Sequence, residues 1–495
     1  MSTLRSTPAA AHPLFIAHGQ TTSGDSVAIS WQGNTLSIST SFDMVGGFTN
    51  GKNVFFYGKS LNSASLAGGP VYYKDGVQSL LPMTTEDKAL SLLGVWIAQS
   101  QGFTVGKDIY LYGEGYCRAG RSHPIFYKNN SLYALPLTSP NGAVQLSGVR
   151  IGPAQHFIAG RDIYFYGMGL DSLVGGSHPI YYKNGELHLL PRYCSNTNAE
   201  FDDITLGANS GFSVGQDIYF YGTASNTDGS QQPFYFKNGV LHSLPLSTSD
   251  GKLRLTNAWL YKTQRPVVGH DIYLYGMGFN SSGQYPICYR NGVLYALPMA
   301  TRDGRLQTDN IWLNDSQCFT TARDIYFYGT GSDKSGHYPV CYKNGALYTL
   351  PMSTQDGSIH FTAVGLGPSQ GFAVGNNAYI YGVGEDHSGR QHPIYYKNGA
   401  LHVLPMTTTD GATAFRTISL NGAQGFSLNE DVYLYGEGYE TTGGRRPLYF
   451  KNNVLHPLPT HTNDDGIVLT DVSFLTSSWL GCGSHLLPVD EANGF

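Results

Sequence analysis

The stretch "DIYFYG", which begins at Asp324, carries large apolar or aromatic side chains on both of its faces. In an extended strand, Ile325 and Phe327 point to one side, and Tyr326 and Tyr328 point to the other. A strand of a sheet that faces water alternates apolar with polar side chains instead. The pattern therefore predicts a strand that is covered on both faces by neighbouring sheets.

This pattern recurs at nearly constant spacing. Copies begin at Asn53, Asp108, Asp162, Asp217, Asp271, Asp324, Asn377 and Asp431, which are 53 to 55 residues apart. A weaker copy, Leu14–Thr40, opens the chain. Self-similarity at a fixed period is typical of repeat architectures. The sequence predicts one domain over residues 1–495, with units that start near 14, 53, 108, 162, 217, 271, 324, 377 and 431.

Each unit reads as four short antiparallel strands, which are clearest in the eighth copy. The strands are predicted at Gly371–Gly375, Ala378–Gly382, Pro393–Gly399 and Ala400–Pro405. The Asn-Gly pair at the end of the third strand supplies the positive φ angles of a two-residue hairpin turn. Pro405 ends the fourth strand because proline has no N–H to donate to the ladder.

Four-stranded sheets with two apolar faces must be sandwiched between neighbours, and radial stacking of such sheets is the all-β fold called a β-propeller. Counting every unit predicts nine blades. The N-terminal unit lacks a first strand, and the segment 472–485 aligns as a lone first strand, so the two are predicted to pair and close the ring. The alternative is eight blades with an N-terminal extension, because only 39 residues separate Leu14 from Asn53.

Charge and hydropathy restrict the classes of partner that the sequence predicts. The net charge is −5, only 13% of residues are charged, and no basic run occurs, so nucleic acid is not an expected partner. No apolar run reaches the ~18 residues of a membrane span. The first 19 residues lack the apolar core of a signal peptide, which predicts a protein that is cytoplasmic or released without a classical signal. No sequence feature calls for a cofactor.

The six cysteines form no CxxC pair. Cys288 and Cys341 occupy the repeat position that Tyr395 fills elsewhere, which is typical of packing residues. Equivalent strand positions in adjacent blades are predicted to lie too far apart for a disulfide. We expect reduced thiols and no metal site built from cysteine.

Tryptophan recurs at one position, seven residues before a first-strand position that holds Phe103, Pro266 and Phe319. The position holds Trp96, Trp259 and Trp312, and elsewhere Arg150, Thr205, Gly365, Ser419 and Ser473. A core position would not accept side chains so different. The position is predicted where the connection between blades enters the first strand, on the side of the loop between second and third strands. Two interpretations stay open: packing in the groove between blades, or contact with a ligand.

Glutamine recurs two residues before the same first-strand position. The series is Gln101, Gln155, Gln264, Gln317, Gln370 and Gln424. If the first strand is innermost, these amides ring the central channel. They either satisfy one another and loop backbone groups, or form a polar collar that holds an ion, water or a ligand.

A third variable position precedes the proline that opens the third strand. It holds His123, His178, His392 and Arg446, with Tyr285, Tyr338 and Gln232 in other units. These residues are predicted at the end of the loop between second and third strands, as a solvated loop end or as ligand contacts.

Catalytic signatures are weak. "GPSQG" (Gly367–Gly371) matches G-x-S-x-G but leads into a strand, whereas a nucleophile elbow joins a strand to a helix. The Asp-Gly pairs that end at Gly251, Gly304, Gly357 and Gly411 recur at one repeat position, as turn residues do. No catalytic residue is assigned.

The motif "DIYFYG…PIYYKNG.L..LP" resembles the YWKNG-type hairpin repeats of uncharacterised bacterial β-propeller proteins, over nearly the whole chain. The resemblance implies the fold and no activity. The predicted architecture is also similar to that of propeller lectins, but no lectin family's binding motif occurs here.

A non-enzymatic recognition protein is therefore the leading hypothesis, with multivalent glycan binding on the loop face favoured over a protein ligand. Repetition lets several weak sites act together. A protein-binding scaffold, such as a toxin or effector component, is the first alternative. A propeller enzyme with a single site at the channel mouth is the second.

Overall fold

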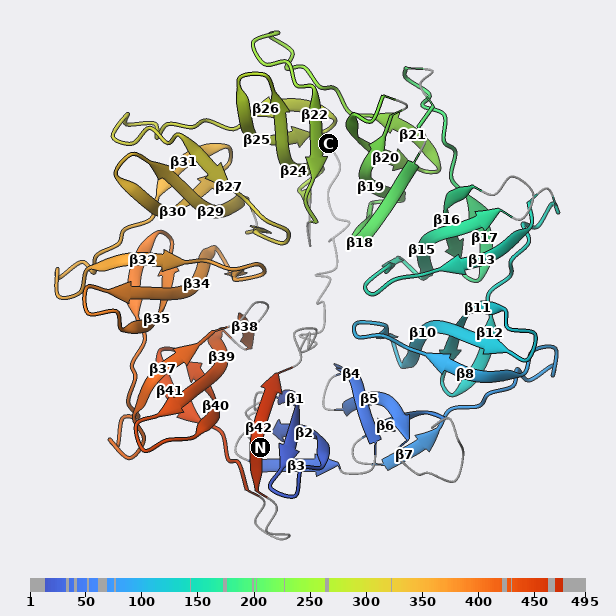
Figure 1. The fold of residues 1–495 in the computed structure, drawn as a ribbon, viewed down its shortest axis with the longest axis horizontal. Coiled ribbons are helices and arrows are strands. Elements are labelled where there is room, and N and C mark those ends of the chain that lie inside the picture. The colour runs from blue at the N-terminus through green and yellow to red at the C-terminus, as the bar shows by residue number, and fades with distance from the viewer. Residues whose placement is uncertain are drawn as a thin grey trace, which may run out of the picture.

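The computed structural model describes residues 14–474, apart from 33–34, 40–41, 51–52, 61–68, 75–76, 143, 172–175, 198–199, 202, 227, 263–266, 322, 421–424, 429 and 462–467. Nine antiparallel sheets stand around a ring in chain order (Figure 1). The fold is a nine-bladed β-propeller, as the count of repeat units predicts, and the eight-bladed alternative is wrong. The described residues contain no helix that could span a membrane.

Each blade contributes a second, a third and a fourth strand to its sheet. The second strands are β1 (Leu14–Thr21), β5 (Asn53–Ser60), β10 (Asp108–Cys117), β15 (Asp162–Asp171), β19 (Asp217–Ser225), β24 (Asp271–Asn280), β29 (Ile325–Asp333), β34 (Asn377–Asp386) and β39 (Asp431–Glu440). The third strands are β2 (Ser26–Gln32), β6 (Pro70–Lys74), β11 (Ser122–Lys128), β16 (Ser177–Lys183), β20 (Gln231–Lys237), β25 (Gly283–Arg290), β30 (Gly336–Lys343), β35 (Gln391–Lys397) and β40 (Arg445–Lys451). The fourth strands are β3 (Thr35–Ser39), β7 (Val77–Leu80), β12 (Ser131–Ala134), β17 (Glu186–Leu189), β21 (Val240–Ser243), β26 (Val293–Ala296), β31 (Ala346–Thr349), β36 (Ala400–Val403) and β41 (Val454–Pro457).

The first position differs from the prediction, because in six blades two consecutive short strands pair with the same second strand. The first strands, in blade order, are β42 (Leu469–Phe474), β4 (Phe42–Asn50), β8 (Leu92–Trp96) with β9 (Gly102–Val105), β13 (Leu146–Arg150) with β14 (His156–Ala159), β18 (Asp203–Val214), β22 (Asn257–Leu260) with β23 (Val267–Val268), β27 (Asn310–Trp312) with β28 (Cys318–Thr320), β32 (Phe361–Gly365) with β33 (Gly371–Val374), and β37 (Phe415–Ser419) with β38 (Gly425–Leu428).

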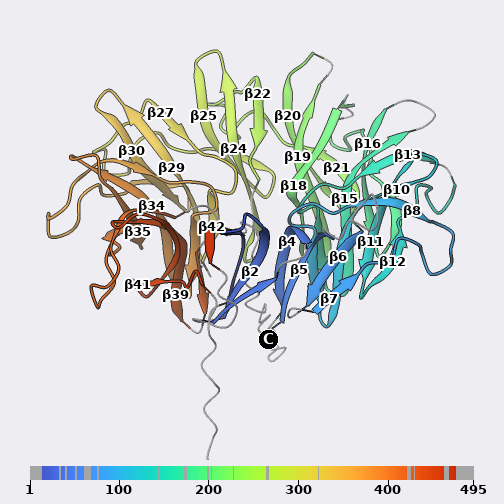
Figure 2. The same ribbon diagram turned by 60° about the horizontal axis from the view of Figure 1, so that its bottom comes forward.

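The ring closes through strands from the two ends of the described chain. β42 pairs antiparallel with β1, with Phe474 opposite Ala17 and Val472 opposite Gly19. Phe474 is 5% exposed and packs against Tyr435 of blade 9. The predicted clasp is confirmed: Figure 1 shows β42 beside β1, and Figure 2 shows β42 next to the dark-blue strands of blade 1, where β2 is labelled. Residues 475–485 of the predicted closing strand lie outside the described residues.

The repeated motif is explained by a hydrogen-bonded network that recurs in blades 3 to 9. In blade 7, Asn344 accepts a hydrogen bond from the N–H of Ile325 at 3.0 Å and donates one to Asp324 at 2.7 Å. Lys343 lies 2.9 Å from the same carboxylate, and its ammonium stands over the ring of Tyr326. These contacts join the start of the second strand to the hairpin turn after the third, which is why these residues recur together.

The hydrophobic core lies between blades rather than within them. One cluster joins Phe103 and Tyr112 of blade 3 to Phe165 and Tyr182 of blade 4. Tyr182 also donates its phenolic hydrogen to the carbonyl of Pro136 in blade 3 at 2.9 Å. The same contact recurs in Tyr127–Pro82, Tyr289–Pro245, Tyr342–Pro298 and Tyr396–Pro351. Each blade is therefore stabilised by its neighbours.

Candidate functional site

The three recurring tryptophans are exposed. Trp96 is 55% exposed, Trp259 39% and Trp312 40%. They lie within strands β8, β22 and β27, opposite Glu114, Met277 and Thr330 of the second strands. The prediction placed them where a loop enters the first strand; the structure extends a strand over the position. Pairing with the second strand fixes the backbone of each tryptophan in a regular sheet, while its indole ring faces solvent.

A glycine of the second strand makes this pairing possible. A Cβ on Gly113 would collide with the backbone oxygen of Trp96, and one on Gly276 would collide with that of Trp259. The glycine that ends each "DIYFYG" copy therefore lets the strand with the tryptophan approach closely.

Each tryptophan ring has a different neighbour. The ammonium of Lys59, in blade 2, lies 4.6 Å from the ring centroid of Trp96 in blade 3. Trp259 packs on Phe279 with centroids 4.2 Å apart, and Trp312 lies 5.9 Å from His337. The positions are equivalent in the fold, but their chemical surroundings are not.

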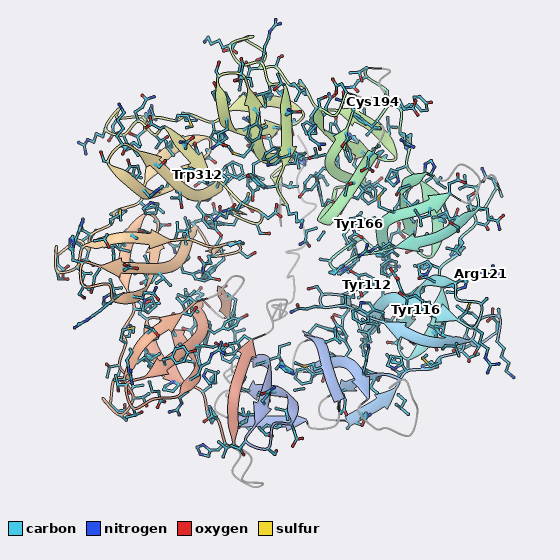
Figure 3. The ribbon with its side chains drawn as sticks, viewed as in Figure 1. Tyr112, Tyr116, Arg121, Tyr166, Cys194 and Trp312 are labelled. Carbon is cyan, nitrogen blue, oxygen red and sulfur yellow. The ribbon has the colours of Figure 1, made fainter. Side chains whose placement is uncertain are left out.

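Blade 3 gathers polar groups beside its tryptophan. The Tyr116 hydroxyl donates to Glu114 at 3.2 Å, and the Ser122 hydroxyl donates to the same carboxylate oxygen at 3.3 Å. Burial and the charge of Glu114 raise the pKa of Tyr116, while the positive charge of Arg150 in blade 4 opposes that shift. Tyr116 is 44% exposed, and Figure 3 shows it farther from the centre of the ring than Tyr112. We call Trp96, Glu114, Tyr116, Ser122 and Arg150 the blade 3–4 cluster.

Glu114 and Tyr116 are not among the residues predicted from the sequence, although a sequence signal exists. "GEGY" occurs twice, at 113–116 and 436–439. In blade 9 the second copy differs in environment, because Glu437 is 7% exposed and forms an ion pair with Arg445. Only the packing around each copy distinguishes an accessible carboxylate from a buried one.

Two of the three histidines, and the arginine, before the third-strand proline contact acids of their own blades. His392 lies 2.9 Å from Asp386, His178 lies 3.7 Å from Asp171, and Arg446 lies 3.0 Å from Glu440. In each pair the acid ends the second strand, so the contact spans one hairpin loop. His123 stands in β11 opposite Gly115, and burial and Arg121 lower its pKa. These pairs connect the two ends of the loop between the second and third strands in their blades.

The glutamines are buried between blades. Gln317 is 1% exposed; its side-chain oxygen accepts from the N–H of Asn314 at 2.8 Å, and its amide donates to the carbonyl of Leu366, in blade 8, at 3.0 Å. The same pair of contacts recurs at Gln101, Gln155 and Gln370. The four described amides are bonded to backbone groups and not to one another. Gln264 and Gln424 lie outside the described residues.

The residues that resemble catalytic motifs have structural roles. Ser369 has a positive φ of 55°, but so do its repeat equivalents Ala154 and Ser316, and its N–H donates to the carbonyl of Ser316 at 2.9 Å. In the Asp-Gly loops, hydrogen bonds from Thr354 and from backbone N–H groups lower the pKa of Asp356 to about 2. Among the described residues, no group of three or more His, Cys, Asp or Glu side chains is placed to hold a metal. The five described cysteines are free.

No protein-family model matches the chain, and no curated protein matches it. Solved structures with a similar chain path include a puromycin-hydrolysing peptidase of Mycobacterium tuberculosis, at 10% identity and a TM-score of 0.34 over 80% of this chain and 58% of that one. Another is the β-propeller domain of the Trilobed protease from Pyrococcus furiosus, at 11% identity and 0.30 over 75% and 99%. The BP39L lectin from Burkholderia pseudomallei is a third, at 10% identity and 0.29 over 74% and 100%. Likenesses at this level, among peptidases and a lectin alike, carry no argument about activity.

Proposed function

We propose that the protein is a non-enzymatic recognition protein that binds glycans on the face carrying Trp96, Trp259 and Trp312. The observation that carries the proposal is the exposure of three indole rings at one repeat position. Exposed aromatic rings offer a flat apolar surface on which a sugar ring can stack, and this contact gains from excluding water.

The blade 3–4 cluster supplies the polar part of such a site. Glu114 accepts hydrogen bonds, and Arg150 donates them in a planar fork. Tyr116 and Ser122 already hold the Glu114 carboxylate, so it is oriented before a ligand arrives. Prior orientation lowers the entropy that binding must overcome.

Recurrence suits weak sites that act together. Trp259 and Trp312 belong to adjacent blades, and a branched or repeating glycan that reaches both gains affinity through effective concentration. The different neighbours of the rings favour different sugars at different blades, which would give selectivity for a composite glycan.

A glycan array tests the proposal with the wild type, each Trp→Ala variant and the triple variant. We expect capture to weaken stepwise as tryptophans are removed. Tyr295→Ala is the matched control, because Tyr295 is an equally exposed aromatic residue, at 49%, on an outermost strand. A glycan signal that the triple variant retains in full would overturn the proposal.

A protein ligand is the second candidate, favoured by one observation. Leu93 is 57% exposed and lies in β8, three residues before Trp96. Leu170 is 55% exposed and lies in β15, which pairs with the strand that carries Arg150. Exposed apolar patches mark protein interaction sites. Loss of capture in Leu93→Ser and Leu170→Ser with no array signal would favour this candidate.

A further inference from the structure

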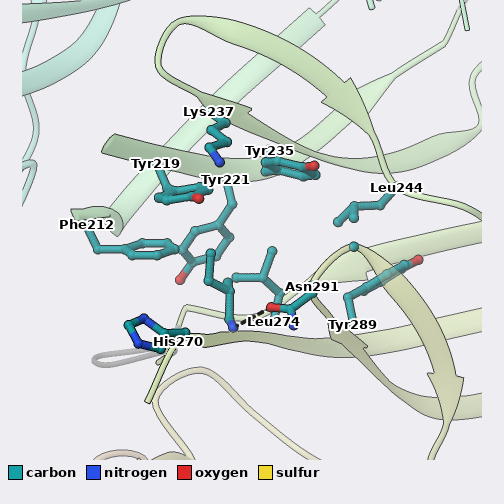
Figure 4. A pocket seen from close by; sticks show the side chains of 12 residues that line it. Phe212, Tyr219, Tyr221, Tyr235, Lys237, Leu244, His270, Leu274, Tyr289 and Asn291 are labelled. Atoms are coloured by element: carbon teal, nitrogen blue, oxygen red, sulfur yellow. Dashed lines mark hydrogen bonds between the residues drawn. The ribbon is translucent and has the colours of Figure 1, made fainter. Parts of the chain in front are cut away.

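A cavity of about 270 Å³ lies between blades 5 and 6 (Figure 4). Tyr219, Tyr235 and Lys237 line it from blade 5, and Leu274 and Tyr289 line it from blade 6. Its volume is near the lower end of the range for small-molecule sites. Tyr289 pairs with Leu274 toward the start of β24, whereas Trp259 pairs with Met277 toward its end, and Trp259 does not line the cavity.

The equivalent groove between blades 8 and 9 is filled by the chain itself. Asn453, in the hairpin turn of blade 9, donates its side-chain amide hydrogen to the hydroxyl of Tyr395 in blade 8 at 2.7 Å. Tyr395 occupies the repeat position of Tyr235, and Asn453 occupies that of Gly292. A carboxamide from the next blade thus completes the groove beside the tyrosine.

Between blades 5 and 6 the same acceptor has no such partner. The hydroxyl of Tyr235 lies 3.9 Å from where a Cβ of Gly292 would stand, and Gly292 carries no side chain. Over the part of the chain that the structure describes, no group hydrogen-bonds to this hydroxyl. The ring orientation is nevertheless the same, because Tyr235 stacks on His242 at 4.8 Å as Tyr395 stacks on His402 at 4.7 Å.

We propose that the cavity between blades 5 and 6 binds the acetamido group of an N-acetylated amino sugar, whose amide N–H donates to Tyr235 as the amide of Asn453 donates to Tyr395. The acetamido group has the same atoms as the end of an asparagine side chain, with a methyl group in place of the link to the backbone. Leu244 and Leu274 line the cavity and offer apolar contact to that methyl group. The ammonium of Lys237 can donate to the amide oxygen, because its bond to Asp217 at 2.8 Å occupies one of three donors.

The wider groove between blades 7 and 8 supports the role of the tyrosine. There Cys341 takes the tyrosine position, and the cavity grows to about 610 Å³. Without the phenol, that cavity lacks the acceptor on which the proposal depends. The inference rests on the proposed glycan function for its ligand class, but on lining residues that do not include the three tryptophans.

Saturation-transfer NMR with N-acetylglucosamine tests the site, with glucose as the ligand that lacks the acetamido group. We expect transfer to the acetamido methyl protons from the wild type and little transfer to glucose. An acetylated-lysine amide carries the same group without a sugar ring, and tighter binding of that probe than of N-acetylglucosamine would overturn the sugar assignment. Equal transfer to glucose would overturn the role of the acetamido group.

Two matched variants locate the site. Gly292→Asn recreates the turn of blade 9 and should fill the cavity with its own carboxamide, which abolishes transfer; asparagine adopts the positive φ of this turn, as Asn453 does at 71°. Tyr235→Phe keeps the ring and removes the acceptor, and should weaken binding roughly 2- to 10-fold. Transfer that persists in Gly292→Asn, with an unchanged melting curve, would show that the cavity is not the site.

The reverse variant tests the same contact in the groove between blades 8 and 9. Asn453→Gly should free Tyr395 and add a second site, seen as a rise in binding stoichiometry; no rise would count against the proposal. The triple Trp→Ala variant separates the two proposals. It should retain N-acetylglucosamine transfer while losing array signal, whereas Gly292→Asn should retain array signal carried by the tryptophan face.

Discussion

The phenolic oxygen of Tyr275, in blade 6, accepts a hydrogen bond from the backbone N–H of Gln317, in blade 7, at 2.9 Å. The same hydroxyl donates to the carbonyl of Asn314 at 2.8 Å. One buried side chain thus satisfies two backbone groups of the next blade. Gln317 in turn contacts Leu366 of blade 8, so three consecutive blades are joined through two residues.

Tyr275→Phe should therefore destabilise the ring although it removes a single oxygen. It leaves the buried N–H of Gln317 without its acceptor, and such a loss costs about 1–3 kcal/mol; the contact to the part-buried carbonyl of Asn314 is lost as well. Chemical denaturation of the purified variant measures the loss. Tyr295→Phe, on an exposed fourth-strand residue, is the control and should leave the free energy of unfolding unchanged.

Gln317→Ala should cost a similar free energy of unfolding, about 1–3 kcal/mol, because both amide contacts are lost from a buried position. Gln78→Ala, at an exposed position of β7, removes the same group from solvent and should be neutral. A Gln317→Ala protein as stable as Gln78→Ala would show that these amides do not fasten the blades.

The pairing of β42 with β1 predicts that truncating the C-terminus strongly destabilises the ring. A chain that ends at Pro459 lacks β42 and exposes the edge of β1, and unpaired strand edges promote aggregation. We expect a large fall in melting temperature or aggregation during a thermal scan. Phe474→Ala tests the same interface without truncation and should cost about 3–5 kcal/mol. Melting like that of the intact chain would contradict the closure of the ring.

The stability of blade 4 should depend on pH through His156. Its ring stacks on Phe103 with centroids 4.2 Å apart, and burial lowers its pKa from 6.5 to about 4. Its native form is neutral, whereas the unfolded chain takes up a proton below about pH 6.5, so stability falls as pH drops from about 6.5 to 4.

His156→Phe keeps an aromatic ring at that position and removes the titrating group. Urea denaturation of both proteins at pH 7 and pH 4.5 should show a smaller fall in stability for the variant. Because the carboxylates titrate alike in both proteins, identical falls would exclude a contribution from His156.

The tryptophans are expected to matter little for stability. Trp259→Ala should change the free energy of unfolding by far less than the 3–5 kcal/mol of a buried aromatic truncation, because the ring is 39% exposed. Phe319→Ala, at the 7% exposed aromatic position of the first strand in blade 7, is the destabilising reference. Equal losses in the two variants would place Trp259 in the core.

The sequence by itself determined the fold and favoured nine blades, and the structure excluded the eight-bladed alternative that the short N-terminal unit left open. Strands with two apolar faces, such as Ile325–Asp333, admit no position except between other sheets, and a period of 53 to 55 residues counts those sheets directly. The clasp also followed from the sequence, because a unit without a first strand and a lone strand at the other end complete one another. These features are local and repetitive, so they can be read one unit at a time.

Tertiary structure decided which repeated residues are exposed and which fasten neighbouring blades. Gln317 and Trp312 recur equally along the chain, yet one is 1% exposed and the other 40%. The cavity beside Tyr235 depends on Gly292, which lies 57 positions later and reaches it only because blade 6 packs against blade 5. Burial and hydrogen bonding across blades depend on how neighbouring sheets stack, and that arrangement is a property of the assembled ring rather than of any single repeat.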